Sequence, residues 1–115
     1  MRCLIVDDNA EFIGAAERLL GSQGIDVVGH ATNGERALEL AGTLAPDVAL
    51  VDIELGQEDG IALTHQLATH APATRVVLIS SYEQDDLGDL IALSPAAGFL
   101  SKTDLGAAAI ARLLD

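Results

Sequence analysis

A polar side chain that could take part in chemistry follows each of four short apolar runs in the sequence. These are Asp7 and Asp8 after CLIV, Asp52 after VALV, Ser80 and Ser81 after VVLI, and Lys102 shortly after GFL. A buried carboxylate without a partner is costly or gives up its charge. Two carboxylates about 4 Å apart repel by roughly 4 kcal/mol at an effective dielectric constant of about 20. If the three aspartates converge, positive charge must lie among them.

These residue types fit a site for a phosphoryl group and a divalent cation. Magnesium takes one or two carboxylates together with water and phosphate oxygens. The Ser80 hydroxyl and the Lys102 ammonium suit the charge that spreads over phosphoryl oxygens. An aspartate can itself be the nucleophile and form an acyl phosphate. The residues alone do not say which aspartate would be that nucleophile.

Each of these residues also has an ordinary structural explanation. One acid after a buried strand is usually a solvated strand end, and the pair Asp7–Asp8 could equally be a helix N-cap. A single serine or lysine is nearly always a surface residue. The joint pattern is more specific, because four separate strand ends carry complementary chemical types. We therefore interpret the set as one site.

The site requires elements that bring these strand ends together. Apolar runs predict strands over residues 3–6, 25–29, 48–51, 76–79 and 98–100. Helical spacing between and after them predicts five helices within residues 10–24, 33–46, 59–72, 84–95 and 104–115, and the second, third and fourth helices should end before Pro46, Pro72 and Pro95. In the first helix the expected inward stripe is Phe12, Ile13, Ala16, Leu19 and Leu20, and the helix should stop at Gly21 or Gly24. In the second helix it is Ala37, Leu38 and Leu40.

Strict alternation of strand and helix predicts an α/β fold with a parallel sheet covered on both faces. The chain, residues 1–115, has the length of one domain. We expect a flavodoxin-like, doubly wound, five-stranded sheet of order 2-1-3-4-5, with the Asp26-containing strand at an edge. Ligands of such sheets bind at the carboxyl ends of the strands, beside the first strand. That edge is where the polar residues of the four runs would meet.

Composition excludes several functions. The net charge of −12, from 18 acidic and 6 basic residues, repels nucleic acid and anionic membrane. Cys3 is the single cysteine, so an internal disulfide is impossible. No apolar run approaches the roughly 18 residues of a membrane span. We expect a cytoplasmic protein that contacts neither membrane nor nucleic acid through these residues.

The motifs LIVDDN, LVDIELGQEDG, VVLIS and GFLSK resemble, in this order, those of response-regulator receiver domains, the phosphate-accepting half of two-component signalling. The resemblance covers residues 1–115. It implies that a sensor histidine kinase phosphorylates Asp52. It also implies a magnesium ion bound directly by Asp8, largely through water by Asp7, and by Asp52 and the backbone carbonyl of Glu54.

The resemblance assigns the remaining site residues as well. Ser80 would hydrogen-bond the phosphoryl group, and Lys102 would pair first with the acceptor carboxylate and then with the phosphate. Phe99 would be the aromatic residue that moves with Ser80. Phosphorylation would change the surface formed by the fourth helix, fifth strand and fifth helix. The chain would then be a signalling phosphoprotein without independent substrate turnover, acting only on its own phosphorylation and dephosphorylation.

Two departures refine this resemblance. Many receivers have proline after the lysine, in a cis peptide, where this chain has Thr103, and Leu55 and Gly56 stand where Met-Pro is common. Both variants resemble receivers of NarL/LuxR-type transcription regulators. We therefore expect a DNA-binding domain beyond Asp115 and a homodimer on phosphorylation. A stand-alone receiver that acts by docking to other proteins is the alternative.

Two other functions are less compatible with the sequence. A haloacid-dehalogenase-type phosphatase also uses an aspartyl phosphate, but it needs a second aspartate two residues after the nucleophile. Glu54 follows Asp52 at that spacing, and Asn9 follows Asp7. A receiver-like module that is never phosphorylated would not need the intact set of Asp7, Asp8, Asp52 and Lys102.

Two further groups of residues have weaker signals. His65 and His70 are interpreted as part of a solvated helix face. The acids near the start of the fourth helix are either a solvated helix start or a partner surface; they are Glu83, Asp85, Asp86 and Asp89.

Overall fold

The computed structural model describes residues 1–81 and 87–115. The strands are β1 (Arg2–Val6), β2 (Asp26–Ala31), β3 (Val48–Asp52), β4 (Glu54–Leu55), β5 (Glu58–Asp59), β6 (Arg75–Ser80) and β7 (Gly98–Ser101). The α-helices are α1 (Ala10–Ser22), α2 (Gly34–Leu44), α3 (Gly60–His70), α4 (Gly88–Leu93) and α5 (Ala107–Leu114), and a 3₁₀ turn, η1, covers Lys102–Asp104.

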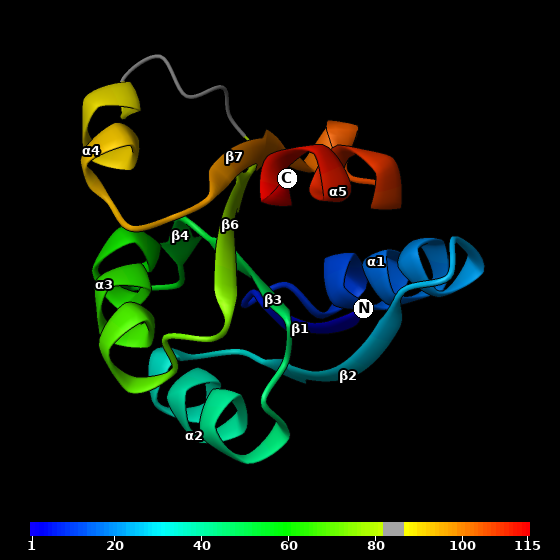
Figure 1. The fold of residues 1–115 in the computed structure, drawn as a ribbon, viewed down its shortest axis with the longest axis horizontal. Helices are drawn as coiled ribbons and strands as arrows, with labels where there is room; N and C mark the ends of the chain where they lie inside the picture. Colours follow the sequence, from blue (N-terminus) through cyan, green and yellow to red (C-terminus); the bar gives the residue numbers. More distant parts are fainter. Residues whose placement is uncertain (82–86) are drawn as a thin grey trace.

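The main sheet has five parallel strands in the order β2-β1-β3-β6-β7. This confirms the predicted order 2-1-3-4-5, with β2 at an edge. In Figure 1, α1 and α5 lie on one side of the sheet, and α2, α3 and α4 lie on the other. The fold is therefore the predicted flavodoxin-like, doubly wound sheet.

The central strands bury side chains on both faces, which explains their continuous apolar sequence. In β1, Leu4 and Val6 join the core beneath α2 and α3, and Cys3 and Ile5 join the core beneath α1 and α5. The same alternation places Val51 in the first core and Leu50 in the second. The two cores fix β1 and β3 side by side, with Val6 paired to Val51.

Side chains at the helix starts set where the helices begin. The Oδ1 of Asn9 accepts the backbone N–H of Phe12 in α1, and that of Asn33 accepts the N–H of Arg36 in α2. Asp59 does the same for Ile61 at the start of α3. Each cap satisfies a backbone donor that the first helical turn leaves open.

The structure corrects several details of the sequence prediction. Leu19, predicted to face inward, is 39% exposed, while Ile13, Ala16 and Leu20 are buried as expected. Of the two predicted stops for α1, Gly21 is part of the helix, whereas the helix ends at Ser22 and Gly24, with φ +89°, follows the cap residue Gln23, so the Gly24 alternative is the one that agrees with the structure. The start of α5 is three residues later than predicted, because Lys102–Asp104 form a 3₁₀ turn. Leu38 and Leu40 are only partly buried, although they pack against the core.

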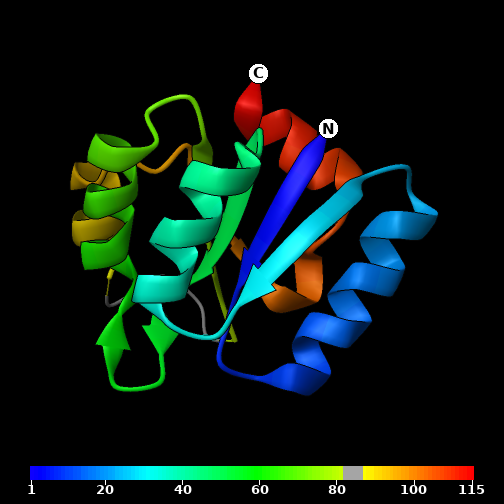
Figure 2. The ribbon, with the colours of Figure 1, turned by 90° about the horizontal axis from the view of Figure 1, so that it is seen from below.

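An unpredicted antiparallel hairpin, β4–β5, lies between β3 and α3. Glu54 pairs with Asp59 and Leu55 with Glu58. Its turn contains Gly56 with φ +63°, a left-handed conformation that glycine adopts without a Cβ clash. Figure 2 shows the hairpin at the end of the molecule toward which the arrowhead of β2 points. It therefore borders the edge where the predicted site lies.

No helix in residues 1–81 or 87–115 is long and apolar enough to cross a lipid bilayer. The acids Glu83, Asp85 and Asp86, together with the predicted start of the fourth helix, lie outside the described residues. Asp89, in the first turn of α4, is exposed, as both interpretations of this acidic group require.

Candidate functional site

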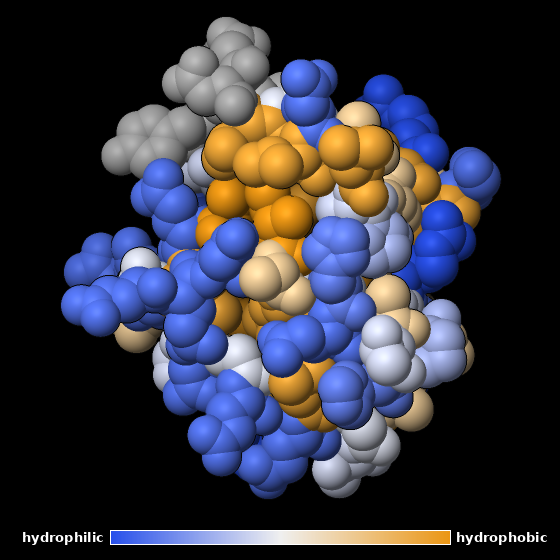
Figure 3. All heavy atoms as spheres, turned by 90° about the vertical axis from the view of Figure 1, so that its left-hand side faces the viewer, coloured by the Kyte–Doolittle hydropathy of each residue, from blue (hydrophilic) through white to orange (hydrophobic). Residues whose placement is uncertain are grey.

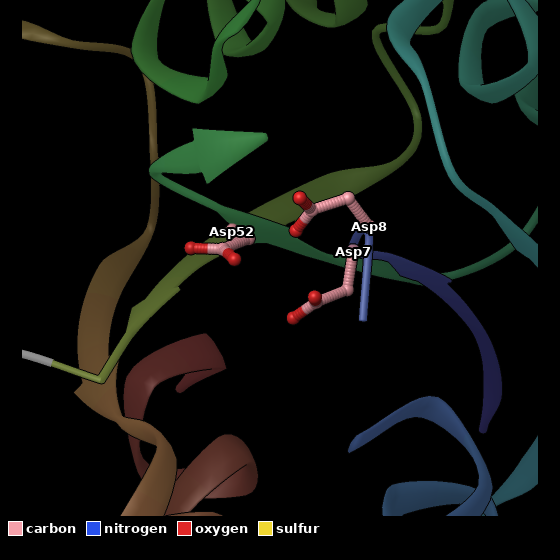
Figure 4. Close-up of side chains that lie close together, drawn as sticks. All are labelled: Asp7, Asp8 and Asp52. Atoms are coloured by element: carbon pink, nitrogen blue, oxygen red, sulfur yellow. The ribbon is translucent and has the colours of Figure 1, made fainter. Parts of the chain in front are cut away.

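Three aspartates converge where β1 and β3 end. Asp7 and Asp8 follow β1 directly, and Asp52 is the last residue of β3. Each contributes a carboxylate oxygen to a group whose members all lie within 4.8 Å of one another. Figure 4 shows the Asp7 and Asp8 side chains extending from the end of β1 toward the side of Asp52. The parallel pairing of β1 with β3 is what brings them together.

Lys102 supplies the positive charge that this cluster requires. Its Nζ lies 2.6 Å from Oδ2 of Asp7 and 3.2 Å from Oδ2 of Asp52. The Lys102 side chain is 13% exposed, so water screens these charges only partly. One ammonium between two carboxylates offsets their mutual repulsion, as expected from the sequence.

Backbone donors fix the other oxygens of the two buried carboxylates. Oδ1 of Asp7 accepts the N–H of Asn9 at 2.8 Å, and Oδ1 of Asp52 accepts the N–H of Glu54 at 3.1 Å. Asp7 is fully buried and Asp52 is 6% exposed, whereas Asp8 is exposed. The three carboxylates therefore differ in access: Asp8 is open to solvent, and Asp7 is held inside.

Burial and charge shift two protonation equilibria at the site. Burial is the main reason that the pKa of Asp52 lies above its usual value, and the negative charge of Asp7 raises it further. The Lys102 ammonium and the Glu54 N–H act in the opposite direction without reversing the shift. For Lys102, burial is the largest influence and lowers the pKa, but the two carboxylates together outweigh it and the net shift is upward.

A cavity of about 240 Å³ opens beside the acidic cluster. Its lining residues are Asp8, Asn9, Asp52, Glu54, Gly56, Ser80, Ser81 and Lys102. The oxygen ligands here are the type that Mg²⁺ and Ca²⁺ prefer. Asp8 is accessible from the cavity, and all three carboxylates lie close enough together to share an ion. The donor set therefore fits a hard divalent cation.

The structure places most of the predicted site residues at this cavity. Ser80 ends β6, is 6% exposed and lines the cavity, and the exposed Glu54 borders it from β4. Phe99 lies elsewhere: it is in the middle of β7, pairs with Leu78, and packs against the core on the α4 side. It is not among the cavity residues in the described part of the chain, so its coupling to Ser80 stays a prediction.

The loop after β7 positions Lys102 with a trans peptide before Thr103. The 3₁₀ turn Lys102–Asp104 follows directly, and the Ser101 hydroxyl accepts the N–H of Thr103 at 3.4 Å. A proline is therefore not needed here to bring the lysine to the site.

Three residues at or near the site were not predicted to belong to it. The ring centroid of Phe12 lies 4.3 Å from Nζ of Lys102. Asn9, besides capping α1, donates its N–H to Asp7. Glu58 accepts the N–H of Gly34 at 3.0 Å and so joins the hairpin to the start of α2. An asparagine before an apolar helical stripe was a readable cap signal, but the Phe12 and Glu58 contacts depend on tertiary packing.

In the described part of the chain, the two histidines of α3 are not among the residues that line the cavity or form the acidic cluster. His65 and His70 are both exposed. Nδ1 of His70 lies 2.9 Å from the backbone carbonyl oxygen of Gln66, one turn earlier. These observations agree with a solvated helix face.

Comparison with known proteins identifies the family. A model described as "Response regulator receiver domain" matches residues 3–111. The chain belongs to this family. Receiver domains of this family occur in the response regulators of two-component systems, and such domains interact with histidine kinases.

The relatives include transcription regulators and an enzyme. The receiver is 33% identical over 116 residues to a transcriptional regulatory protein NarL from Mycobacterium tuberculosis, covering 100% of this chain and 54% of NarL. It is 40% identical over 86 residues to a protein-glutamate methylesterase/protein-glutamine glutaminase from Alkalilimnicola ehrlichii, covering 74% of this chain and 22% of that protein. The chain thus spans about half the length of the curated regulators it matches.

Solved structures agree with the fold of this receiver. The signal receiver domain of NarL from Mycobacterium tuberculosis superposes with a TM-score of 0.85 at 32% identity, covering 98% of this chain and 95% of that one. A response regulator from Burkholderia pseudomallei, solved with a phosphorylated aspartic acid, a calcium ion and citrate, gives a TM-score of 0.86 at 28% identity, covering 99% and 66%.

Proposed function

We propose that residues 1–115 form one receiver domain that acts as a phosphorylation-dependent switch, with Asp52 accepting a phosphoryl group from a sensor histidine kinase. The observation that carries this proposal is the position of Asp52. Its carboxylate lines the cavity, lies 3.2 Å from the Lys102 ammonium, and has the Asp7 and Asp8 oxygens within 4.8 Å. The related protein from Burkholderia pseudomallei, solved with a phosphorylated aspartic acid, supports it.

In the proposed transfer, a carboxylate oxygen of Asp52 attacks the phosphorus atom. The bond from phosphorus to the imidazole nitrogen of the kinase histidine breaks, and its electron pair stays on that nitrogen. The Glu54 N–H, 3.1 Å from Oδ1, orients the carboxylate for attack. Lys102 pairs with Asp52 before the transfer and with phosphoryl oxygens after it. The Ser80 hydroxyl then donates a hydrogen bond to the phosphoryl group.

Asp7, Asp8, Asp52 and the backbone carbonyl of Glu54 would hold Mg²⁺. When bound, the ion neutralises charge on the carboxylates and on the phosphoryl group. Asp8 suits a direct ligand, because it is exposed to the cavity. Asp7 is better suited to bind the ion through water, because Lys102 and the Asn9 N–H already contact its two carboxylate oxygens.

The proposed output surface is formed by α4, β7 and α5. Figure 3 shows a large apolar area on the side of the molecule that carries α4. In α4, Leu90 is 54% exposed and Leu93 is 80% exposed. Exposed leucines on a short helix favour a protein contact there, and we propose that phosphorylation changes it and promotes a homodimer.

The proposed output is transcription, through a C-terminal DNA-binding domain as in a NarL/LuxR-type regulator. The likeness to NarL supports it, and the charge of −12 argues against direct DNA contact by this receiver. A stand-alone receiver that docks to other proteins is the second candidate. The methylesterase relative bears on this choice, because receivers also occur beside outputs other than DNA binding. In either case we propose a cytoplasmic protein without substrate turnover of its own.

Incubation with acetyl phosphate and Mg²⁺, followed by intact-mass measurement, tests the proposal. The parent should gain the mass of one phosphoryl group, and Asp52→Asn should gain none. Asp26→Asn is the matched control, because Asp26 is an exposed aspartate at the start of the edge strand β2. It should be labelled as the parent is. Equal labelling of parent and Asp52→Asn would remove Asp52 as the acceptor.

A further inference from the structure

An aromatic ring forms one side of the Lys102 environment. Phe12 lies in the first turn of α1, is partly buried, and packs against the core on the α1 and α5 side. Its ring centroid is 4.3 Å from Nζ of Lys102. The chain contains two phenylalanines and one tyrosine in all. One of these few aromatic side chains therefore contacts the single cation placed in the acidic cluster of the described residues.

Phe12 and Lys102 belong to a closed circuit of contacts around Asp7. The N–H of Asn9 donates to Oδ1 of Asp7 at 2.8 Å, and Oδ1 of Asn9 accepts the N–H of Phe12 at 3.2 Å. The Phe12 ring contacts Nζ of Lys102, and the same Nζ lies 2.6 Å from Oδ2 of Asp7. The N-terminal turn of α1 and the end of β7 are thus tied together through the fully buried Asp7.

The Phe12 ring provides an electrostatic attraction for the Lys102 ammonium that an aliphatic side chain cannot provide. The face of an aromatic ring carries negative potential and attracts an ammonium ion, and the attraction grows as water is removed. Two carboxylates also contact Nζ, and the lysine side chain is only 13% exposed. A leucine at position 12 would fill space beside the stem of Lys102 but would leave that side of the ammonium without a partner.

We propose that Phe12 is a positioning residue for Lys102. Its ring holds the ammonium between Asp7 and Asp52, so that Lys102 stays in place while the negative charge on Asp52 passes to the phosphoryl group. The effect on phosphorylation rests on the proposed function of Asp52. The contact itself does not, and it is tested separately.

A double-mutant cycle on stability tests the contact. Urea unfolding is measured at one pH and ionic strength for the parent, Phe12→Leu, Lys102→Met and the double variant. If the ring stabilises the ammonium, Phe12→Leu should lower the folding equilibrium constant more in the parent than in Lys102→Met, by an additional factor of about two to five. Equal effects in both backgrounds would overturn the proposal, because a ring that only fills space does not depend on the lysine charge.

Phosphorylation rates test the consequence. With acetyl phosphate and Mg²⁺, Phe12→Leu should accept the phosphoryl group roughly three to ten times more slowly than the parent, because small misplacements of a charged group slow transfer steeply. Phe12→Tyr keeps the ring and should restore most of the rate. A Phe12→Tyr rate as low as that of Phe12→Leu, or a Phe12→Leu rate equal to the parent's, would contradict the positioning role. Failure of the parent itself to be labelled would overturn the function of Asp52, and the stability cycle would still decide the contact.

Discussion

Asp7 and Lys102 form the closest ion pair of the acidic cluster, with Nζ 2.6 Å from Oδ2 of an aspartate that is fully buried. The pair leaves Asp52 as the more weakly held carboxylate, at 3.2 Å from the same ammonium. If Asp52 is the proposed acceptor, Lys102 can stay paired with Asp7 while the Asp52 carboxylate reacts. This arrangement separates an acid that anchors the lysine from an acid available for reaction.

The negative charge of Asp7 should have a measurable effect on the pKa of Asp52. Burial is the largest cause that raises the pKa of Asp52, and the negative charge of Asp7 is the second. Asp7→Asn keeps the size of the side chain but removes this charge, so the pKa of Asp52 should fall. Titration of the Asp52 carboxyl carbon by NMR, in the parent and in Asp7→Asn, measures the change. A pKa of Asp52 that stays the same or rises in the variant would show that Asp7 does not act on it electrostatically.

Ionised Asp52 should weaken the fold at neutral pH. A pKa raised above its usual value means that the folded state favours the protonated acid, so this group destabilises the fold above its folded pKa. The cost disappears as pH falls through that pKa toward the usual value of 3.8. Asp52→Asn should therefore be more stable than the parent at pH 7, and the gap should shrink toward about pH 4. Urea unfolding at both pH values measures it, and a gap that widens in acid would contradict the upward shift.

Magnesium should stabilise the fold through Asp8. An ion that binds only the folded state stabilises it by about 1.4 kcal/mol at ten times its dissociation constant. Thermal unfolding of the parent should shift upward with MgCl₂ and much less in Asp8→Ala. Asp26→Asn, which changes an exposed acid on β2, should keep the full response. NaCl at the same ionic strength is the control that separates Mg²⁺ binding from a general effect of salt. The same Mg²⁺ shift in the parent and Asp8→Ala would argue against a site built on this residue.

Gly60 should not tolerate a side chain. A Cβ at this position would lie 2.0 Å from the backbone oxygen of Asp52, a clash with backbone atoms. Gly60→Ala should cost about 3 kcal/mol of unfolding free energy or more and displace Asp52. Gly42→Ala is the control, because Gly42 lies in α2 with nothing within 4 Å of its Cβ position. It should gain about 0.5–1 kcal/mol. Urea unfolding compares the two variants with the parent. A Gly60→Ala protein as stable as the parent would mean that the backbone around Asp52 can shift to accommodate the added methyl group.

The fold and the convergence of the charged residues were predictable because both follow from strand patterning. Continuous apolar runs identify strands buried on two faces, and a parallel sheet places all their carboxyl ends at one edge. Asp7, Asp8, Asp52 and Lys102 needed no further information to be placed together. The proposal that Asp52 is the acceptor comes from the family resemblance, since charge alone does not distinguish three neighbouring aspartates.

Other features depend on packing that local patterns do not encode. The β4 and β5 strands have two residues each, too few to show a period. Leu19 fits the apolar stripe of α1, yet the sheet and α5 do not cover it, and it stays exposed. The contact between Phe12 and Lys102 joins residues far apart in sequence, so it depends on how α1 packs beside the end of β7.

The most direct test of the account is to identify the residue that carries the phosphoryl group. Sodium borohydride reduces an acyl phosphate to the alcohol and so converts a phosphorylated aspartate into homoserine. After treatment with acetyl phosphate and Mg²⁺, borohydride reduction and peptide mass spectrometry should find homoserine at Asp52, and at neither Asp7 nor Asp8. Homoserine at Asp7 or Asp8 instead, or at none of the three in a folded protein, would contradict the assignment of Asp52 as the phosphoryl acceptor.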